Sequence, residues 1–460
     1  MLAVLRNVTY RRLFSAQVVA LLGTGLLTVA LGLLAFDLAG ADAGAVMGTA
    51  LTVKMLAYVF FAPVINALVA RLPKKPVLIG ADLVRAAMAL FLPFITETWQ
   101  IYLVVFLLQS ASATFTPAFQ SLIPAVLKDE KDYTRALSLS RLAYDLEAVI
   151  SPAAAALLLS VLTYNNLFLG TVAGFVVSAL LVAATGLPAS GPSTPVAAQQ
   201  DPLWHRTTLG ARIFWRNRQL RSLLALNLVV AAPTALVLVN AVVYVRDVLG
   251  RPEADLALAL ACFGVGSMAV ALGAPRLLDR FGDRAVMLSG AALIPLVLAA
   301  VTAVTLQAGA VQAGGMPSGV MPDGVMPDGG GPGMAAGAAA WWWLLGLWFL
   351  LGAGNATILT PSSRLLRAAS TEETRPYVFT AQFSLSHACY IISYPLAGWL
   401  GAAAGLGWAA AALTLLAIIG SAGAFLSWPR HAAPAQADPV SELEPDEQPT
   451  EQPPGQRARN

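Results

Sequence analysis

Long apolar segments dominate the chain, and they fall into two sets of six on either side of a polar, proline-rich stretch. Most have close to the ~20 residues that a helix needs to cross the hydrocarbon of a bilayer. Because 57% of the residues are hydrophobic, 12% are charged and the mean hydropathy is +0.70, the composition excludes an ordinary soluble protein. We therefore predict an all-α membrane protein with twelve transmembrane helices, at approximately residues 13–36, 45–69, 77–95, 100–123, 138–160, 166–187, 222–245, 255–275, 286–307, 339–360, 377–399 and 405–427.

Polar residues at the edges of these segments repeat between the two sets. Arg6 and Asn7, before the first segment, return as Arg216 and Asn217 before the seventh, about 210 residues later. A similar offset relates the basic loops that follow the second and the eighth segments. A duplicated six-helix unit indicates a transporter fold, in which two pseudo-symmetric halves move about a central site.

Lysine and arginine are distributed unevenly about the predicted spans. Outside the spans, nearly all of them lie on the side that carries both termini, and only Arg246 and Arg251 are expected on the other side. Basic residues are retained on the cytoplasmic side of a membrane. We therefore predict a multi-pass protein of the inner (plasma) membrane with both termini in the cytoplasm.

The composition also predicts where the halves and their connections lie. Residues 1–187 form the N-terminal half, and residues 188–221 form a cytoplasmic linker that ends in an amphipathic helix. Residues 222–430 form the C-terminal half, with a Met-, Gly- and Pro-rich outer loop at 308–338. Its thioethers could hold Cu(I), but a flexible low-complexity loop is favoured because His and Cys are absent from it. The acidic residues 431–460 are expected to be a disordered cytoplasmic tail.

The loops after the second and eighth segments carry related motifs. Both are basic, and the second also has an acid and a glycine: the first contains Arg71, Lys74 and Lys75, and the second contains Asp279, Arg280, Gly282 and Arg284. They resemble the Gly-x-x-x-Asp-Arg-x-Gly-Arg-Lys loop of the major facilitator superfamily. That resemblance implies the fold of this superfamily and a role for the loops in latching the two halves at the cytoplasmic face. The first copy departs from the pattern because Ala70 replaces the acid.

A second resemblance concerns the predicted fourth and fifth helices. Residues 115–124 (FTPAFQSLIP), 133–138 and 151–152 are similar to the corresponding segment of the drug:proton antiporter branch, which includes macrolide and siderophore exporters. A weaker similarity to nickel-resistance exporters lacks the His-rich tail that would support it.

Four ionisable residues lie deep within predicted spans of both halves. Lys54 is in the second span, Asp145 and Glu147 are in the fifth, and His387 is in the eleventh. A charge at the bilayer centre costs about 2.5–3.5 kcal/mol, so it normally faces a cavity or a partner. The spacing predicts that these three helices bring titratable groups toward one depth of the membrane.

Helical spacing separates paired charges from unpaired ones. Arg141 and Asp145 are four residues apart, and Asp82 and Arg85 are three apart, so each pair can neutralise itself along one helix face. We interpret both pairs as structural. Other charges within these spans lack such a partner.

Glu147 and Lys54 have no partner at helical spacing. We therefore expect Glu147 or Asp145 to carry the coupling proton, with Lys54 as a counter-charge that tunes it. The alternative is a fixed ion pair that braces the inner half of the bundle.

His387 and several amides are further candidates. His387 can titrate near neutral pH, although a hydrogen-bonded core histidine fits the sequence as well. The amides fall mainly on the first, fourth, seventh and tenth spans, which the superfamily resemblance makes the cavity-lining helices. They are candidate substrate contacts or interhelical hydrogen bonds: Gln17, Gln109, Asn227, Asn240, Asn355 and Gln382.

These features predict a secondary active transporter that exports a small amphipathic molecule in exchange for protons by alternating access. No Gly-x-x-x-x-Gly-Lys-Ser/Thr loop occurs, so ATP bound to this chain is not expected to drive transport. No catalytic constellation stands at working spacing, so an enzyme is not expected. The expected partners are the substrate, protons and the lipid bilayer, without nucleic acid, cofactor or resident metal, and the monomer is the superfamily default.

Two other functions remain open from the sequence. A divalent-metal exporter of the nickel or cobalt type would use His387 and the acidic pair as ligands. A non-transporting membrane receptor or scaffold would use the acidic tail, and it is ranked last because charges within the membrane have no purpose without a pathway.

Overall fold

The computed structural model describes residues 2–61, 72–127, 129–186, 211–313, 332–371 and 374–428, and its regular elements within these ranges are all helices. The first half comprises α1 (Val8–Ala39), α2 (Ala43–Leu56), α4 (Lys74–Phe91), α5 (Thr98–Val126), α6 (Glu130–Leu159) and α7 (Asn165–Ala183). The second comprises α9 (Arg218–Val242), α10 (Glu253–Ala313), α11 (Pro332–Ala368), α12 (Arg375–Ala404) and α13 (Leu406–Ser427). Helices α2 and α9 continue as π-helical segments, Ala57–Phe61 and Val243–Val248.

Helix α10 is two transmembrane helices joined by a sharp kink. At Gly282 the backbone has φ 74° and ψ 162°, which is not helical and which L side chains rarely adopt. The kink separates residues 253–281 from 283–313. By length and composition, seven stretches of the described chain can cross a membrane, and two of them, Val8–Phe61 and Glu253–Gln307, each contain two helices. With α5, α6 and α12, the described residues form the twelve predicted transmembrane helices.

The repeated Arg-Asn dipeptide starts the first helix of each half. The Asn7 side-chain oxygen accepts a hydrogen bond from the Tyr10 backbone N–H at the start of α1. The Asn217 side-chain oxygen does the same for Gln219 and Leu220 at the start of α9. Asparagine is a favoured residue at this position because its oxygen satisfies amide groups that the first turn leaves unpaired. The duplication seen in the sequence is therefore a duplicated helix start.

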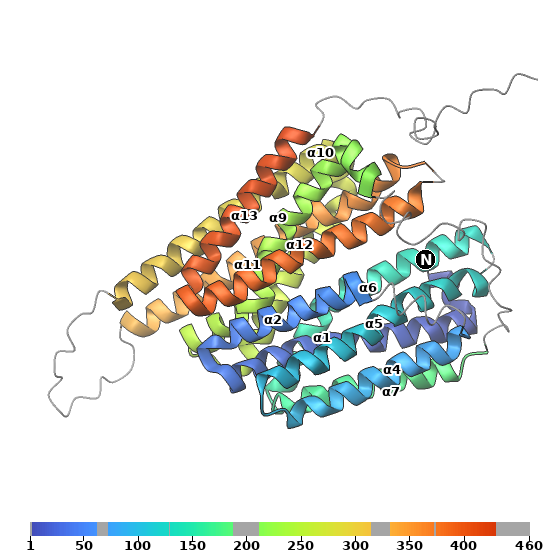
Figure 1. The fold of residues 1–460 in the computed structure, drawn as a ribbon, viewed down its shortest axis with the longest axis horizontal. Coiled ribbons are helices and arrows are strands. Elements are labelled where there is room, and N and C mark those ends of the chain that lie inside the picture. Colours follow the sequence, from blue (N-terminus) through green and yellow to red (C-terminus); the bar gives the residue numbers. More distant parts are fainter. Residues whose placement is uncertain are drawn as a thin grey trace, which may run out of the picture.

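The helices form two groups (Figure 1). Helices α1, α2 and α4–α7 pack together, as do α9–α13, and the groups meet mainly where α2 packs on α12 and α6 packs on α10, with a smaller contact between α2 and α9. We call the end of the bundle where α1 begins and α13 ends the terminal end, and the opposite end the distal end. This arrangement confirms the predicted fold of two six-helix halves.

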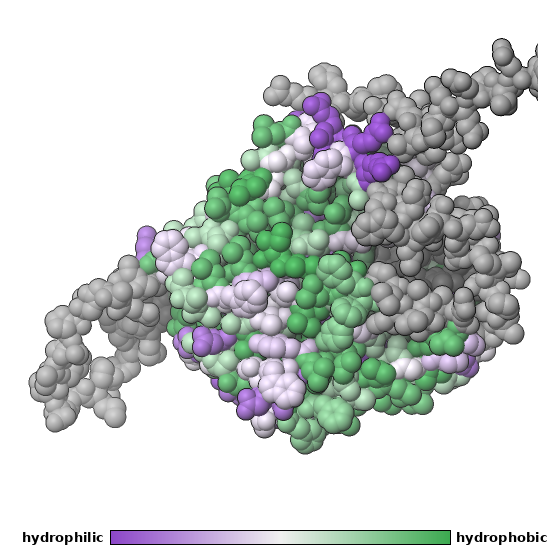
Figure 2. Space-filling model, viewed as in Figure 1, coloured by the Kyte–Doolittle hydropathy of each residue, from purple (hydrophilic) through white to green (hydrophobic). Residues whose placement is uncertain are grey.

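The surface of the helical bundle is apolar. Large hydrophobic side chains such as Leu157, Leu272 and Leu296 are at least 70% exposed along helices that span the molecule. Figure 2 shows hydrophobic residues covering most of the visible face, with strongly hydrophilic residues mainly toward its ends. Such a surface is stable only in a nonpolar solvent, so the chain is a multi-pass membrane protein.

Glycines allow α2 and α12 to touch across the two halves near the distal end. A Cβ atom on Gly398 would lie 2.4 Å from the Gly44 carbonyl oxygen, and one on Gly48 would lie 2.7 Å from that of Tyr394. Beside them, the Trp399 indole N–H donates a hydrogen bond of 2.9 Å to the Thr49 hydroxyl. Small residues let membrane helices approach closely. We call this contact of α2 and α12 the distal seam.

Within the second half, α10 and α11 cross at even closer range. A Cβ atom on Gly266 would lie 2.0 Å from the Phe349 carbonyl oxygen, and one on Gly352 would lie 1.9 Å from that of Phe263. Neither position has room for any side chain, so the two backbones are in direct contact. Gly346, also on α11, differs because an added Cβ would meet no atom within 4 Å.

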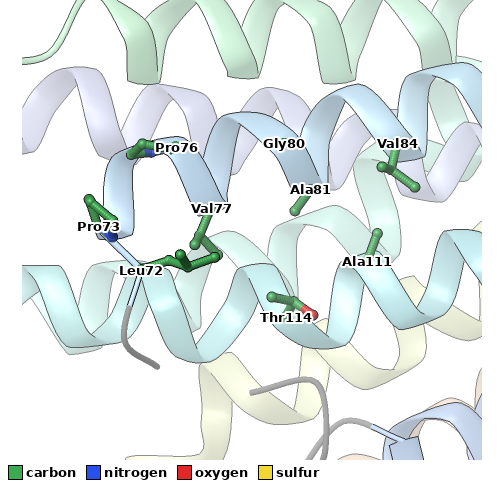
Figure 3. Close-up of a pocket in the computed structure, with 9 residues that line it drawn as sticks. All are labelled: Leu72, Pro73, Pro76, Val77, Gly80, Ala81, Val84, Ala111 and Thr114. Carbon is green, nitrogen blue, oxygen red and sulfur yellow. The ribbon is translucent and has the colours of Figure 1, made fainter. Parts of the chain in front are cut away.

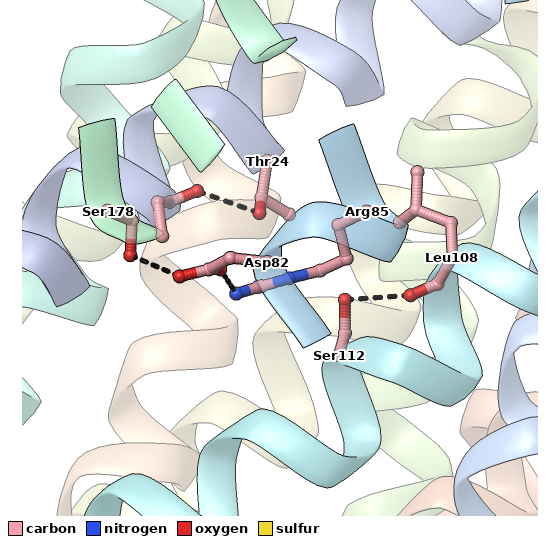
Figure 4. Close-up of polar contacts among 7 residues, drawn as sticks. Thr24, Asp82, Arg85, Leu108, Ser112 and Ser178 are labelled. Carbon is pink, nitrogen blue, oxygen red and sulfur yellow. Dashed lines mark hydrogen bonds and ion pairs between the residues drawn. The ribbon is translucent and has the colours of Figure 1, made fainter. Parts of the chain in front are cut away.

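The first half contains a buried ion pair among α4, α5 and α7 (Figure 4). Asp82 and Arg85 of α4 are buried and form an ion pair with each other, and the Ser178 hydroxyl of α7 donates a hydrogen bond of 2.7 Å to Asp82. The guanidinium carbon of Arg85 lies 4.4 Å from the ring centre of Phe115 and 4.5 Å from that of Phe175. Cation–π contacts of this kind are strong when desolvated. The site is neutral and almost fully enclosed.

Some expected segments differ or fall outside the described residues. Helix α10 continues to Ala313 and α11 begins at Pro332, because the helices extend into the predicted outer loop from both sides. The Met-Pro repeat lies outside the described residues, as does the tail. Of the predicted amphipathic helix, residues 211–216 are helical, with Phe214 buried and Trp215 exposed.

We predict that Gly266→Ala destabilises the second half. The new methyl group overlaps the Phe349 carbonyl oxygen, so α10 and α11 must separate, at a cost of about 1–3 kcal/mol. The midpoint of thermal unfolding in detergent should fall. Gly346→Ala is the matched control, because alanine there fills open space and improves helix propensity by about 0.5–1 kcal/mol. Equal midpoints for the two variants would contradict the crossing geometry.

We predict that the Asp82–Arg85 pair is strongly coupled. Asp82→Asn or Arg85→Met alone leaves one buried charge without its partner and should destabilise the fold by about 3–5 kcal/mol. The double variant removes both charges, so it should be less destabilised than the sum of the single variants. Thermal midpoints of the four proteins in detergent measure this, and strictly additive losses would show that the pair is not coupled.

Candidate functional site

Three titratable side chains from three helices lie at the junction of the halves. Lys54 of α2 interacts electrostatically with Glu147 of α6 in its own half and with His387 of α12 in the other. All three are partly buried. No direct ion pair joins Lys54 and Glu147 in the part of the chain that the structure describes. Lys54, Glu147 and His387 therefore interact without a direct ion pair between the lysine and the acid, and we call these three side chains the open charge cluster.

The backbone of α1 provides the room for Glu147. A Cβ atom on Gly25 would lie 2.7 Å from the Glu147 Oε1 atom and 2.1 Å from the Cβ of Ser151. The Ser151 hydroxyl is fully buried and has no hydrogen-bond partner among the described residues. Any side chain at position 25 would therefore displace α6 or its carboxylate.

An aromatic face on α12 adjoins the charge cluster. The ring centres of Phe383 and His387 are 4.1 Å apart, those of His387 and Tyr390 are 6.4 Å apart, and Tyr390 stacks on Tyr394 at 5.2 Å. Tyr58 reaches this face from α2, stacking on His387 at 5.7 Å with an interplanar angle of 25°. Tyr58 lies in the π-helical segment that follows α2, and such segments recur at functional sites.

Apart from His387, the residues of the aromatic face are missing from the candidates chosen by sequence. The signal that could have found it is the spacing of residues 383, 387, 390 and 394, which places four rings on one side of a helix. Tyr58 has no such signal, because its position depends on the π-helical segment. The His387 ring is held in place through its own Nδ1 atom, which lies within hydrogen-bond distance, 2.7 Å, of the Phe383 carbonyl oxygen.

The paired charges occupy different surroundings from the cluster. Asp82 and Arg85 pair with each other inside the first half, as their spacing predicts. The side chains of Arg141 and Asp145 lie outside the described residues. Of the two candidate proton carriers, the structure therefore positions only Glu147.

The candidate amides all make interhelical hydrogen bonds. In the first half, Gln17 accepts from Ser140 at 3.1 Å, and Gln109 accepts from the Tyr58 hydroxyl at 3.5 Å. In the second half, Asn227 and Gln382 bond each other reciprocally at 3.0 and 3.1 Å, Asn240 donates to the Ala397 carbonyl, and Asn355 donates to Thr234. These contacts match the alternative that the amides join helices. The buried Asn240 and Asn355 oxygens have no partner among the described residues.

The basic loops lie at the terminal end. Arg71 lies outside the described residues, whereas Lys74 begins α4 and Lys75 donates from Nζ to the Thr185 carbonyl at 2.9 Å. In the second loop Gly282 makes the kink of α10, and the Arg280 guanidinium lies 5.3 Å from the Phe281 ring centre. The remaining motif residues, Asp279 and Arg284, are exposed.

The acid that makes an ion pair in this loop is Asp283. Its Oδ1 atom lies 3.6 Å from Nε of Arg364 on α11, which joins two helices of the second half. The acid that belongs to the motif, Asp279, has no ion-pair partner among the described residues. The kink at Gly282 changes the direction of the chain between the two acids, so the motif alone does not identify which one points at α11.

No group of three His, Cys, Asp or Glu side chains in the described residues is arranged to hold a metal ion. The cluster around Glu147 therefore combines one acid, one amine and one imidazole beside aromatic rings. Such a set can exchange protons and contact an apolar or cationic molecule.

Comparison with solved structures agrees with the fold. The D323A mutant of the nucleoside transporter NupG matches with a TM-score of 0.63 and 15% identity, over 91% of this chain and 98% of that one. A bacterial homologue of the human lysosomal transporter Spinster, in an inward-facing and unoccupied conformation, matches with a TM-score of 0.64 and 12% identity, over 92% and 96% of the two chains. A bacterial metal transporter matches with a TM-score of 0.58 and 12% identity, over 91% and 98%. At these identities the similarity concerns the fold alone.

Similar sequences include macrolide efflux protein A from two organisms. The protein of Streptococcus pyogenes is 29% identical over 184 residues, which are 39% of this chain and 45% of the relative. That of Enterococcus faecalis is 31% identical over 155 residues, which are 32% and 48%. The chain thus spans about half the length of the curated relatives it matches, and they agree with the resemblance to macrolide exporters noted in the sequence.

The family model of the Major Facilitator Superfamily matches residues 13–322, which include most of the first half and, in the second half, all of α9 and α10. The twelve helices in two groups of six have the same fold as transporters of solved structure. The chain belongs to the major facilitator superfamily of membrane transporters.

Proposed function

We propose that this transporter is a proton antiporter that exports a small amphipathic molecule across the inner membrane. The terminal end faces the cytoplasm in this proposal, because the basic loops lie there and basic residues are retained on the cytoplasmic side. The transporter acts as a monomer. Glu147 carries the proton, and Lys54 is the counter-charge.

The observation that carries the proposal is the open charge cluster at the junction. Lys54 interacts with Glu147 from one half and with His387 from the other, so the balance of charge depends on how the halves are placed. Charges within a membrane normally mark a proton or substrate pathway. A movement that separates α2 from α12 changes the surroundings of Lys54 and therefore the preference of Glu147 for its proton.

The substrate class follows from the aromatic face and the relatives. Phe383, His387 and Tyr390 present rings from one half, and Tyr58 adds a ring from the other. Rings beside a carboxylate suit a molecule with an apolar body and a polar or cationic group. Macrolide export by the similar proteins supports a substrate of this amphipathic kind.

The distal seam supports alternating access. Its glycine contacts and the Trp399–Thr49 hydrogen bond hold α2 against α12 at the distal end, on the far side of the charge cluster from the basic loops. Transport requires that this seam opens while the terminal end closes, as in rocking about a central site. The described residues contain no group of three His, Cys, Asp or Glu side chains arranged to hold a metal ion, and the Asp145 side chain that the metal-exporter alternative would use lies outside them.

We predict that Glu147→Gln abolishes substrate-dependent proton flux in reconstituted vesicles. Glutamine keeps the size of the side chain but cannot bind and release a proton. A panel of macrolides, other amphipathic amines, Ni²⁺ and Co²⁺ should first identify a compound that moves protons with the unaltered protein. Asp42→Asn, at an exposed turn of the distal end, is the matched control and should keep the flux.

Two outcomes of that experiment would overturn parts of the proposal. Undiminished flux in Glu147→Gln would remove Glu147 as the proton carrier, and Asp145→Asn would then be measured. Proton flux with the metals alone would replace the amphipathic substrate by a divalent cation.

We predict that Gly25→Ala impairs transport because its methyl group overlaps Ser151 and approaches the Glu147 carboxylate. Adding Ser151→Gly removes the closest overlap and should restore a substantial part of the export rate. Gly346→Ala, which fills open space, should leave export unchanged. Full export by Gly25→Ala alone would show that the position of Glu147 against α1 does not matter.

A further inference from the structure

A groove runs along the outside of the first half between α4 and α5 (Figure 3). It has a volume of about 350 Å³, at the lower end of the range for ligand pockets. Figure 3 shows Val77 and Ala81 of α4 facing Ala111 and Thr114 of α5. The groove begins at the terminal end of α4, so it starts at a membrane surface.

The lining offers an occupant hydrocarbon and almost nothing polar. Val77, Gly80, Ala81 and Ala111 contribute only apolar side chains or none. The Thr114 hydroxyl donates to the Ser110 carbonyl at 3.0 Å and is therefore already satisfied. A polar molecule would lose its hydration here without gaining partners. The groove fits an apolar chain.

The groove opens along the edge where α4 meets α5, and its lining extends inward to the buried Ala81. Leu78, Asp82 and Arg85 are buried on the inner face of this helix, whereas Leu72 and Val84 of the groove are 52% and 44% exposed. A Cβ atom on Gly80 would meet no atom within 4 Å. The missing side chain leaves part of the groove empty, and in a membrane that space is in contact with lipid.

A basic residue follows Pro73 of the groove lining in the sequence. Lys74 is the first residue of α4, and within the part of the chain that the structure describes its side chain makes no hydrogen bond or ion pair. From Lys74 to Val84 the helix rises roughly 15 Å at ~1.5 Å per residue. That is half of a hydrocarbon core of about 30 Å, so the groove spans one leaflet.

We propose that an anionic phospholipid of the leaflet at the terminal end occupies this groove, with one acyl chain between α4 and α5 and its phosphate against Lys74. The apolar lining selects a hydrocarbon chain and the lysine selects a negative headgroup. The site is separate from the charge cluster. In the orientation proposed above, the lipid belongs to the cytoplasmic leaflet.

Native mass spectrometry of the full-length protein tests the site with phosphatidylglycerol and phosphatidylcholine of identical acyl chains. The unaltered protein should bind its first phosphatidylglycerol about fivefold more tightly than phosphatidylcholine, the preference expected of one lysine. Gly80→Leu fills the groove and should weaken the first binding of both lipids at least about fivefold. Lys74→Gln should remove the headgroup preference and retain binding of the chain.

Matched variants separate this site from general effects. Gly346→Leu adds the same side chain at another open glycine, and Arg276→Gln removes another exposed basic residue of the terminal end, so both should bind lipid as the unaltered protein does. The proposal would be overturned if Gly80→Leu binds both lipids as tightly as the unaltered protein does. If Gly80→Leu does not fold, a full phosphatidylglycerol preference in Lys74→Gln would overturn it instead. Lipid binding is measured without transport, so its failure is distinct from failure of the proton-antiport proposal.

Discussion

The structure depends on how ionisable side chains are accommodated within hydrocarbon. An isolated charge there is unfavourable by several kcal/mol, so each must find a partner or an aqueous surface. Asp82 and Arg85 meet this constraint inside one half, as a neutral pair enclosed by a hydroxyl and two rings. Lys54 meets it at the junction through Glu147 of its own half, where His387 of the other half is also close enough to interact with its charge. The Asp82–Arg85 pair lies within one helix bundle, whereas the surroundings of Lys54 depend on how the two bundles are placed relative to each other.

Close glycine contacts make each half rigid, so that the two halves can move as units about their junction. Gly266 and Gly352 bring the backbones of α10 and α11 into direct contact, and in the first half Gly174 of α7 packs against the Val19 carbonyl of α1. Interiors this tightly packed move as units. The contact of Gly48 with α12 joins one half to the other, so separation there changes the junction without repacking either bundle.

Sequence reasoning succeeded where the signal is local. The number of transmembrane helices follows from the apolar runs, and the repeated Arg-Asn dipeptide indicated the duplication, although the capping role of Asn7 and Asn217 and the earlier helix starts became clear only from the structure. The candidate site was less accessible because its contacts join distant segments. Gln109 looks the same in the sequence whether its amide binds substrate or accepts a hydrogen bond from Tyr58. Likewise, the motif does not show that Asp283, rather than Asp279, pairs with Arg364, because this depends on the kink at Gly282. Charge positions, by contrast, were sufficient to bring Lys54, Glu147 and His387 together as candidates.

Helix α4 connects the lipid-facing surface to the junction. Its outer face forms the groove at Gly80, and its inner face carries Arg85, which interacts electrostatically with Tyr58. Tyr58 in turn stacks on His387 of the other half. The Arg85 side chain is enclosed by two rings and paired with Asp82, so it moves together with these neighbours when α4 shifts. A shift of α4 therefore changes the position of the Arg85 charge relative to Tyr58, so the helix that forms the groove is linked electrostatically to the charge cluster.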